Sequence, residues 1–223
     1  MLNPKKYNAI VKKITDYSEG IYSVLFKMPS VVKFKPGQFL HLTLDEYDQS
    51  SGYWPESRVF SISSSPNTDE VEIVYSVKGV YTKRMSEELS ESKSVWLKMP
   101  YGDFIIENHI KSGEKVFLVA GGTGISPFIS FLRSYKNGYD ITLYYGIRNQ
   151  KLYIYKEILE NLKNNINLNV IEGLMNVEDI SKKIFENSNS KTFISGPINM
   201  INSYKEKLIN LGYDKNNIII DEW

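Results

Sequence analysis

The spacing of apolar residues changes near residue 110, and this change most constrains the fold. Before residue 105 the sequence alternates apolar and polar residues in short segments between turns, as in Ile21–Phe26, Gln38–Leu44 and Val71–Val77. A period of two is typical of strands with one buried face, so this half predicts an antiparallel six-stranded β-barrel. Tyr81–Leu89 is rich in helix formers and predicts one short helix.

After residue 114 an apolar strand, a turn and a helix follow one another repeatedly. The predicted strands are Val116–Ala120, Ile141–Tyr145, Leu168–Ile171, Thr192–Ile194 and Ile218–Ile220. The predicted helices are Ser126–Lys136, Leu152–Lys163, Val177–Glu186 and Asn199–Leu211. Parallel neighbours need crossover connections, so this order predicts a five-stranded parallel sheet with helices on both faces. The α+β chain therefore has two predicted domains, residues 1–107 and 108–223.

Composition excludes several classes of protein. The net charge of +1 gives no electrostatic case for binding nucleic acid. No apolar run approaches the roughly 20 residues that span a bilayer, and the start has no secretory pattern, so we expect a cytoplasmic protein without membrane insertion. The chain has no cysteine, and its two histidines, His41 and His109, lack ligand neighbours. We therefore expect no metal site, and any redox chemistry needs a bound organic cofactor.

A glycine-rich turn joins the first strand of the second half to its helix. Gly121, Gly122 and Gly124 precede Pro127, which suits a first helical turn. Glycines allow close approach of the backbone, and the helix start offers unpaired N–H groups to a pyrophosphate. A tight turn without a ligand is an equally good explanation of these glycines alone.

A second pattern lies in the first half, where an arginine, an aromatic ring and hydroxyls share an extended segment, Arg58–Pro66. Arg58, Phe60 and Ile62 share one face of the predicted strand. Arginine binds phosphate, an aromatic ring packs on a flat heterocycle, and a hydroxyl can bond a ring nitrogen. The alternative is an amphipathic strand that ends in a serine-rich turn.

These motifs together resemble the ferredoxin–NADP reductase superfamily. Its flavin motif Arg-x-Tyr/Phe-Ser-x-x-Ser matches Arg58, Phe60, Ser61 and Ser64, and its dinucleotide motif Gly-Gly-x-Gly-x-x-Pro matches Gly121, Gly122, Gly124 and Pro127. Further similar segments are Lys35–Phe39, Val77–Thr82, Pro100–Phe104, Tyr145–Arg148 and Ser195–Pro197. The resemblance spans nearly the whole chain, and its order is more specific than any single motif.

The resemblance implies a flavin site in the first domain. Arg58 would pair with the pyrophosphate, Phe60 would lie against the flavin, and Ser61 would bond near the ring nitrogen that accepts hydride. Further implied contacts come from Val59, Ser64, Val77, Lys78, Gly79, Val80, Tyr81 and Thr82. Thr82 is equally well explained as an ordinary helix cap.

The resemblance also implies a nicotinamide dinucleotide site in the second domain. The implied contacts are Gly121, Gly122, Thr123, Gly124, Pro127, Arg148, Gly196 and Pro197. Hydride would pass directly from nicotinamide to flavin, with Ser61, Ser195 and Trp223 as candidate catalytic residues. Ser195 stands where many relatives have cysteine, and it could be a plain turn serine. Trp223 is either a cover for the flavin or a residue packed on the surface.

The flavin, the electron donor and the electron acceptor are the remaining expectations. FAD is expected over FMN by family habit, and Glu172, after the third parallel strand, favours NADH over NADPH as donor. The expected acceptor is a protein such as ferredoxin or flavodoxin. Two alternatives stay open: an electron-transfer subunit of a larger redox complex, and a catalytically silent flavin- or nucleotide-binding regulatory module.

Overall fold

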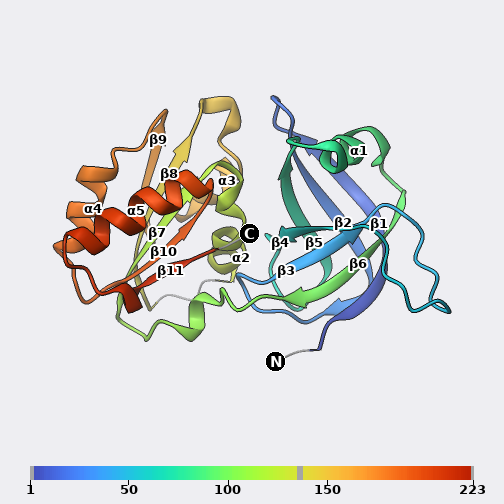
Figure 1. Cartoon of the computed structure of the whole chain (residues 1–223), viewed down its shortest axis with the longest axis horizontal. Coiled ribbons are helices and arrows are strands. Elements are labelled where there is room, and N and C mark those ends of the chain that lie inside the picture. Colours follow the sequence, from blue (N-terminus) through green and yellow to red (C-terminus); the bar gives the residue numbers. More distant parts are fainter. Residues whose placement is uncertain (1–2, 135–137, 222–223) are drawn as a thin grey trace. The chain divides into compact units, whose positions relative to one another are not determined.

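A computed structural model describes residues 3–134 and 138–221. The chain divides into two compact units (Figure 1). Unit 1 holds the chain up to Ile105 together with Ile129–Ser134, and unit 2 holds Ile106–Phe128 with the chain that follows Ser134. The assignment of one function to residues 1–107 and another to 108–223 stays a prediction.

Unit 1 is built on a six-stranded antiparallel sheet that curves into a barrel (Figure 1). Its elements are β1 (Lys5–Asp16), β2 (Ile21–Val32), β3 (Phe39–Thr43), β4 (Arg58–Ser61), β5 (Thr68–Ser76), α1 (Val80–Glu88) and β6 (Ser94–Tyr101). The strand order is β4-β3-β6-β1-β2-β5, and a bridge between Ile62 and Ile73 joins the two ends. The predicted barrel with one short helix is confirmed.

The barrel core explains the alternation in the sequence. Every second residue of a strand points inward, so Val24 and Phe26 on β2 and Ile73 on β5 are fully buried. Helix α1 contributes Tyr81 and Met85 to the same apolar cluster. Burial of these side chains, rather than helix propensity alone, holds so short a helix in place.

Unit 2 is built on a five-stranded parallel sheet (Figure 1). Its elements are β7 (Lys115–Gly121), β8 (Asp140–Ile147), α3 (Lys156–Leu162), β9 (Asn167–Glu172), α4 (Val177–Phe185), β10 (Lys191–Ser195), α5 (Ile198–Asn210) and β11 (Ile218–Ile220). Helix α2 (Ser126–Arg133) begins in unit 2, and its residues from Ile129 onward belong to unit 1. Short 3₁₀ turns occupy Ile106–Asn108, Gly122–Ile125, Gln150–Leu152 and Lys215–Asn217. The strand order β11-β10-β7-β8-β9 confirms the predicted parallel sheet with helices.

This strand order reverses direction at β7, where the chain first extends to β8 and β9 and later returns to β10 and β11. Because such crossovers are right-handed, the connections before and after the return cover opposite faces of the sheet. Helices α4 and α5 pack on each other and on one face through Ile184, Tyr204 and Leu208. Ligands of open parallel sheets bind at such a reversal, beyond the carboxyl ends of the strands.

Two predicted helix bounds differ from those in the structure. The helix expected from Leu152 begins only at Lys156, because Tyr155 has a left-handed backbone with φ of 60° and interrupts it. Tyr153, Ile154 and Tyr155 are all buried, so tertiary packing overrides the local helical pattern. The helix expected to reach Lys136 ends at Arg133, and Lys136 itself lies outside the described residues.

Candidate functional site

The glycine-rich turn lies at the carboxyl end of β7, the strand where the sheet order reverses. The strand ends at Gly121, the 3₁₀ turn Gly122–Ile125 follows, and α2 starts directly at Ser126. The hydroxyl of Ser126 donates to the carbonyl of Thr123 at 2.8 Å. The predicted strand–turn–helix context of a phosphate-binding turn is therefore present.

Gly124 and Gly196 allow the turn and the end of β10 to lie in close contact. A Cβ atom on Gly124 would lie 2.5 Å from the carbonyl carbon of Ser195 and 2.6 Å from Cα of Gly196. A Cβ on Gly196 would lie 3.0 Å from the amide nitrogen of Gly121. The turn and the Ser195–Pro197 segment, predicted separately, are thus brought together at one edge of the sheet.

Gly122 is the glycine of the turn that has free space beside it. Its φ is +54°, and a Cβ there would meet no atom within 4 Å. The hydroxyl of the buried Tyr145 lies 3.2 Å from the Gly122 carbonyl, which ties the turn to β8. This glycine meets both expectations from the sequence, a left-handed backbone and room for a ligand to approach.

Ser195 is buried at the end of β10 and is hydrogen-bonded to a carboxylate. Its Oγ donates to Oδ2 of Asp221, also buried, at 2.9 Å. The backbone amide of Asp221 donates to the carbonyl of Ile194 at 3.0 Å, which sets the register of this contact. Sequence reasoning chose Ser195 but missed Asp221, which precedes Glu222 and Trp223, two residues outside the described part of the chain.

Two exposed side chains follow the next strands along this edge. Arg148 comes directly after β8, and Glu172 is the last residue of β9. The side-chain amide of Gln150 donates to Oε2 of Glu172 at 3.0 Å. The carboxyl edge of unit 2 therefore presents an acidic group where open α/β sheets contact the adenosine ribose.

In unit 1 the guanidinium of Arg58 is held by three neighbours. It bonds Oε1 of Glu56 at 2.8 Å and the Ser57 carbonyl at 2.9 Å, and its Cζ lies 4.7 Å from the centre of the Tyr81 ring. An arginine has five N–H donors, and only two of them are used in these contacts. About half of the side chain is exposed, so the unused donors can reach a phosphate.

The serines of the flavin motif divide into structural and available hydroxyls. Ser63 Oγ donates to the Glu72 carbonyl at 3.0 Å, and Ser64 Oγ accepts from the Glu72 amide at 3.1 Å, which closes the barrel between β4 and β5. Among the residues that the structure describes, Ser61 Oγ has no such partner. Phe60 packs against the barrel core, with its ring centre 6.2 Å from that of Tyr75.

Two residues near the end of α2, Ser130 and Arg133, also donate hydrogen bonds to the backbone of Ser63 and Ser64. The hydroxyl of Ser130 donates to the Ser64 carbonyl at 2.8 Å. Arg133 pairs with Glu72 at 2.6 Å and donates to the Ser63 carbonyl at 3.2 Å. No sequence signal marked Ser130 or Arg133, because both contacts join segments more than 60 residues apart.

The first turn of α1 is open to an anion. Gly79 is the N-cap and supplies no side-chain cap, and Val80 is 83% exposed. Thr82 is folded back, since its Oγ accepts from the amides of Lys78 at 2.9 Å and Gly79 at 3.1 Å. Val77, before the turn, is half-buried against the barrel core. The amides of the first turn, which have no acceptor within the helix, are therefore better candidates for binding an anion than the Thr82 hydroxyl.

The described residues contain no group of three or more acidic or histidine side chains that could hold a metal ion. Within the same residues, no helix has both the length and the apolar character needed to cross a membrane. The arginine and the helix start in unit 1, and the glycine turn in unit 2, suit phosphate-bearing ligands.

Comparison with known proteins agrees with this assignment. The family described as "Oxidoreductase NAD-binding domain" matches residues 118–175. Flavohemoprotein A of Dictyostelium discoideum is 25% identical over 94% of this chain, and the chain spans 58% of that protein. The flavodoxin/ferredoxin–NADP reductase of Buchnera aphidicola is 25% identical, with 94% of this chain and 81% of that protein covered.

Solved structures show the same fold over the whole chain. A ferredoxin NADP⁺ reductase from Neisseria gonorrhoeae, solved with bound FAD and NADP, matches with a TM-score of 0.80 and 17% identity over 99% of both chains. The matched family and the sequence relatives indicate an NAD(P)H-dependent flavin oxidoreductase. The chain belongs to the ferredoxin–NADP reductase-like superfamily of FAD- and NAD(P)-binding oxidoreductases.

Proposed function

We propose that this protein oxidises NADH with a bound FAD and then passes electrons to a protein such as ferredoxin or flavodoxin. The observation that carries the proposal is the edge of unit 2, where the open Gly122 turn and the Ser195–Gly196 segment are in contact. Such an edge suits a dinucleotide, with its pyrophosphate at the helix start. Flavin supplies the chemistry, because it accepts a hydride and releases electrons singly.

The flavin site is proposed in unit 1. Arg58 offers three N–H donors that no described residue uses, and the first turn of α1 offers amides without an acceptor in the helix, so both suit a pyrophosphate. Phe60 is proposed to contact the flavin ring. The Ser61 hydroxyl, which no described residue bonds, is proposed to form a hydrogen bond with the hydride-accepting nitrogen. Val59, Ser64, Lys78 and Thr82 remain in the proposed contact set by family resemblance.

The donor site is proposed in unit 2. Gly121, Gly122, Thr123, Gly124 and Pro127 would hold the pyrophosphate, and Gly196 with Pro197 would contact the nicotinamide end. Ser195 is proposed to lie at the reacting ring carbon, with its hydroxyl oriented by Asp221. Hydride transfer needs the two rings held in contact, so orientation supplies most of the acceleration. Arg148 and Trp223 keep their proposed roles as a dinucleotide contact and a flavin cover.

The preference for NADH rests on Glu172. Its carboxylate ends β9 and can accept a hydrogen bond from the 2′-hydroxyl of the adenosine ribose, whereas the 2′-phosphate of NADPH would meet a like charge. Lys151 and Arg148 are the nearby cations in sequence that could oppose this preference. A comparison of catalytic efficiency with NADH and with NADPH decides whether Glu172 or these cations set the donor preference.

One experiment identifies the bound flavin, compares the two donors and tests whether the flavin is reduced. The purified protein is denatured to identify its flavin, and the intact protein is titrated anaerobically with NADH and NADPH while flavin absorbance is followed. We expect FAD, with bleaching at lower concentrations of NADH than of NADPH. Flavin that does not bleach with either donor would favour a silent binding module instead. Ferredoxin, flavodoxin and cytochrome c are then compared as acceptors of the reduced protein.

The second candidate is an electron-transfer subunit of a larger complex. The named flavohemoprotein relative is longer than this chain, which spans 58% of it, so related sequences occur inside larger proteins. Co-purification of a stable partner that accelerates turnover would favour this reading. Full activity of the isolated chain with a freely diffusing acceptor would count against it.

A further inference from the structure

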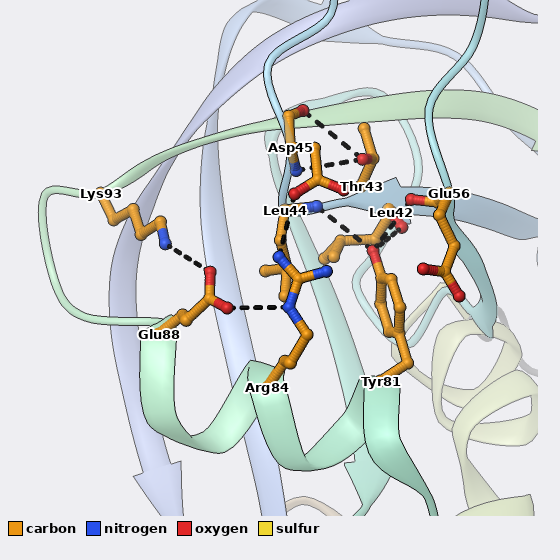
Figure 2. A network of polar contacts seen from close by, with 9 residues as sticks. All are labelled: Leu42, Thr43, Leu44, Asp45, Glu56, Tyr81, Arg84, Glu88 and Lys93. Carbon is orange, nitrogen blue, oxygen red and sulfur yellow. Dashed lines mark hydrogen bonds and ion pairs between the residues drawn. The ribbon is translucent and has the colours of Figure 1, made fainter.

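The side chain of Tyr81 connects the elements that form the proposed flavin phosphate site. Tyr81 is in the first turn of α1, and it is 4% exposed. Its hydroxyl donates to the Leu42 carbonyl at 2.8 Å and accepts from the Leu44 amide at 3.2 Å (Figure 2). The Glu56 carbonyl lies 3.4 Å from the same hydroxyl. One phenol thus joins α1, the end of β3 and the segment that leads into β4.

The ring of Tyr81 makes a second kind of contact. The Cζ of Arg58 lies 4.7 Å from the ring centre, within the range of a cation–π interaction. Arg84 lies farther away, at 6.0 Å, and is already paired with Asp45 at 2.9 Å and Glu88 at 2.8 Å (Figure 2). Arg84 is therefore paired with two carboxylates, whereas Arg58 is paired with the single carboxylate of Glu56, so the positive charge of Arg58 is the less neutralised of the two.

We propose that Tyr81 is the positioning residue of the flavin phosphate site, because it fixes Arg58 and the first turn of α1 to the same rigid point of the barrel. A free arginine loses much rotamer entropy when it binds phosphate, and a guanidinium already stacked on a ring loses less. This inference rests on the proposed function and deepens it. The proposed role belongs to the side chain of Tyr81, whereas the family resemblance implies only that the segment around Tyr81 contacts the pyrophosphate.

The Tyr81 hydroxyl keeps its proton under all ordinary assay conditions. Burial raises the pKa of Tyr81 to about 12, against a partly compensating contact with the Leu44 amide. The positioning effect should therefore not change between pH 6 and pH 9. Any change in flavin affinity over that range must come from other groups.

The test compares flavins that have phosphate with one that lacks it. Dissociation constants of FAD, FMN and riboflavin are measured by fluorescence quenching on flavin-free protein for the wild type, Tyr81→Leu and Tyr81→Phe. Tyr81→Leu removes the ring and should weaken FAD and FMN binding by roughly 5- to 20-fold, with riboflavin changed by less than about twofold. Tyr81→Phe keeps the ring but loses the hydroxyl contacts with Leu42 and Leu44, so it should lower the melting temperature and weaken FAD and FMN binding less than Tyr81→Leu does.

Tyr47 provides a matched control in the same unit. It is also buried, Lys6 lies 4.3 Å from its ring centre, and its hydroxyl is bonded to the Lys6 ammonium. Tyr47→Leu therefore removes a comparable ring–cation contact that is not attached to Arg58. It should lower stability without separating FAD from riboflavin.

Several results would overturn the inference. Equal weakening of FAD and riboflavin by Tyr81→Leu, or a phosphate-specific loss in Tyr47→Leu as well, would assign Tyr81 a general structural role. If Tyr81→Leu does not fold, Tyr81→Met fills similar space without a ring and must show the phosphate-specific loss. A wild-type protein that binds no flavin would refute the proposed function itself, which is a distinguishable outcome.

Discussion

Replacing Gly124 with alanine tests whether the glycine turn is held against the end of β10. The φ of Gly124 lies outside the left-handed region, so alanine brings no backbone strain of its own. The new Cβ would lie 2.5 Å from the Ser195 carbonyl carbon, about 0.9 Å closer than the 3.4 Å of ordinary contact. The atoms that it meets are backbone atoms, so the turn or the strand end must move.

The size of the effect follows from that displacement. Overpacking of a well-packed contact costs roughly 1–3 kcal/mol. For a unit of this size, each kcal/mol lowers the melting temperature by roughly 4–8 °C. A displacement of about 1 Å at a reacting centre can also cost roughly 10²-fold in rate. We expect Gly124→Ala to lower both the melting temperature and the rate of flavin reduction by NADH.

The assay pairs this variant with a control in the same unit. Gly113 has φ of +83° and no atom within 4 Å of a Cβ, so Gly113→Ala costs only the left-handed backbone, roughly 1–2 kcal/mol. It precedes β7, at the end opposite the turn. Melting temperatures come from differential scanning calorimetry, NAD⁺ affinity from titration calorimetry, and hydride transfer from stopped-flow absorbance.

The two variants should separate stability from ligand binding. Gly113→Ala should melt earlier and still bind NAD⁺ and reduce flavin like the wild type. Gly124→Ala should be impaired in all three measurements. If Gly124→Ala melts and reacts like the wild type, the close approach of the turn to Ser195 and Gly196 does not exist in solution, and the reasoning fails.

Three further predictions concern single side chains. Ser195→Cys is expected to speed hydride transfer in stopped-flow experiments, but also to lower the melting temperature, since a thiol is a weak donor to the Asp221 carboxylate; a slower or unchanged rate would remove the proposed role. Glu172→Ser should raise the efficiency of NADPH relative to NADH by roughly tenfold, about 1.4 kcal/mol, in steady-state assays, and an unchanged ratio would dissociate Glu172 from donor choice. Burial, and then the charge of Lys98, lower the pKa of His41 in the folded state. The neutral imidazole therefore contributes its full stability above the unfolded pKa of about 6.5, and this contribution is lost as the pH falls through the folded pKa. In urea unfolding, His41→Gln should lose less stability than the wild type between pH 7.5 and pH 5.

The order of elements could be predicted from the sequence because two different periods mark the two halves. Strand alternation in Val71–Val77 and the strand–helix repeat after residue 114 are local patterns, and local patterns survive folding. The start of α3 could not be predicted in this way. Leu152 and the residues after it have a helical pattern, but burial of Tyr153 and Tyr155 imposes a turn on that segment.

The parts of the site that depend on backbone conformation could be predicted from the sequence, whereas contacts between distant side chains could not. Gly121, Gly122 and Gly124 mark the turn, because glycine is the residue for close approach and positive φ. The partner of Ser195 lies 26 residues away, and it depends on the register of β10 with β11. The stacking of Arg58 on Tyr81 likewise depends on how α1 docks on the barrel, which no local pattern records.

The two neighbours of Arg58 differ in what they do when a phosphate arrives. Glu56 competes with the ligand for the same donors, but both side chains are about half exposed, and such a pair contributes roughly 0–1 kcal/mol. A phosphate with greater charge can therefore displace Glu56 at little cost. Tyr81 contacts the face of the guanidinium and leaves its edge free, so it can stay in place while the edge binds phosphate. The ring therefore orients Arg58 both before and after binding, whereas Glu56 holds it only before.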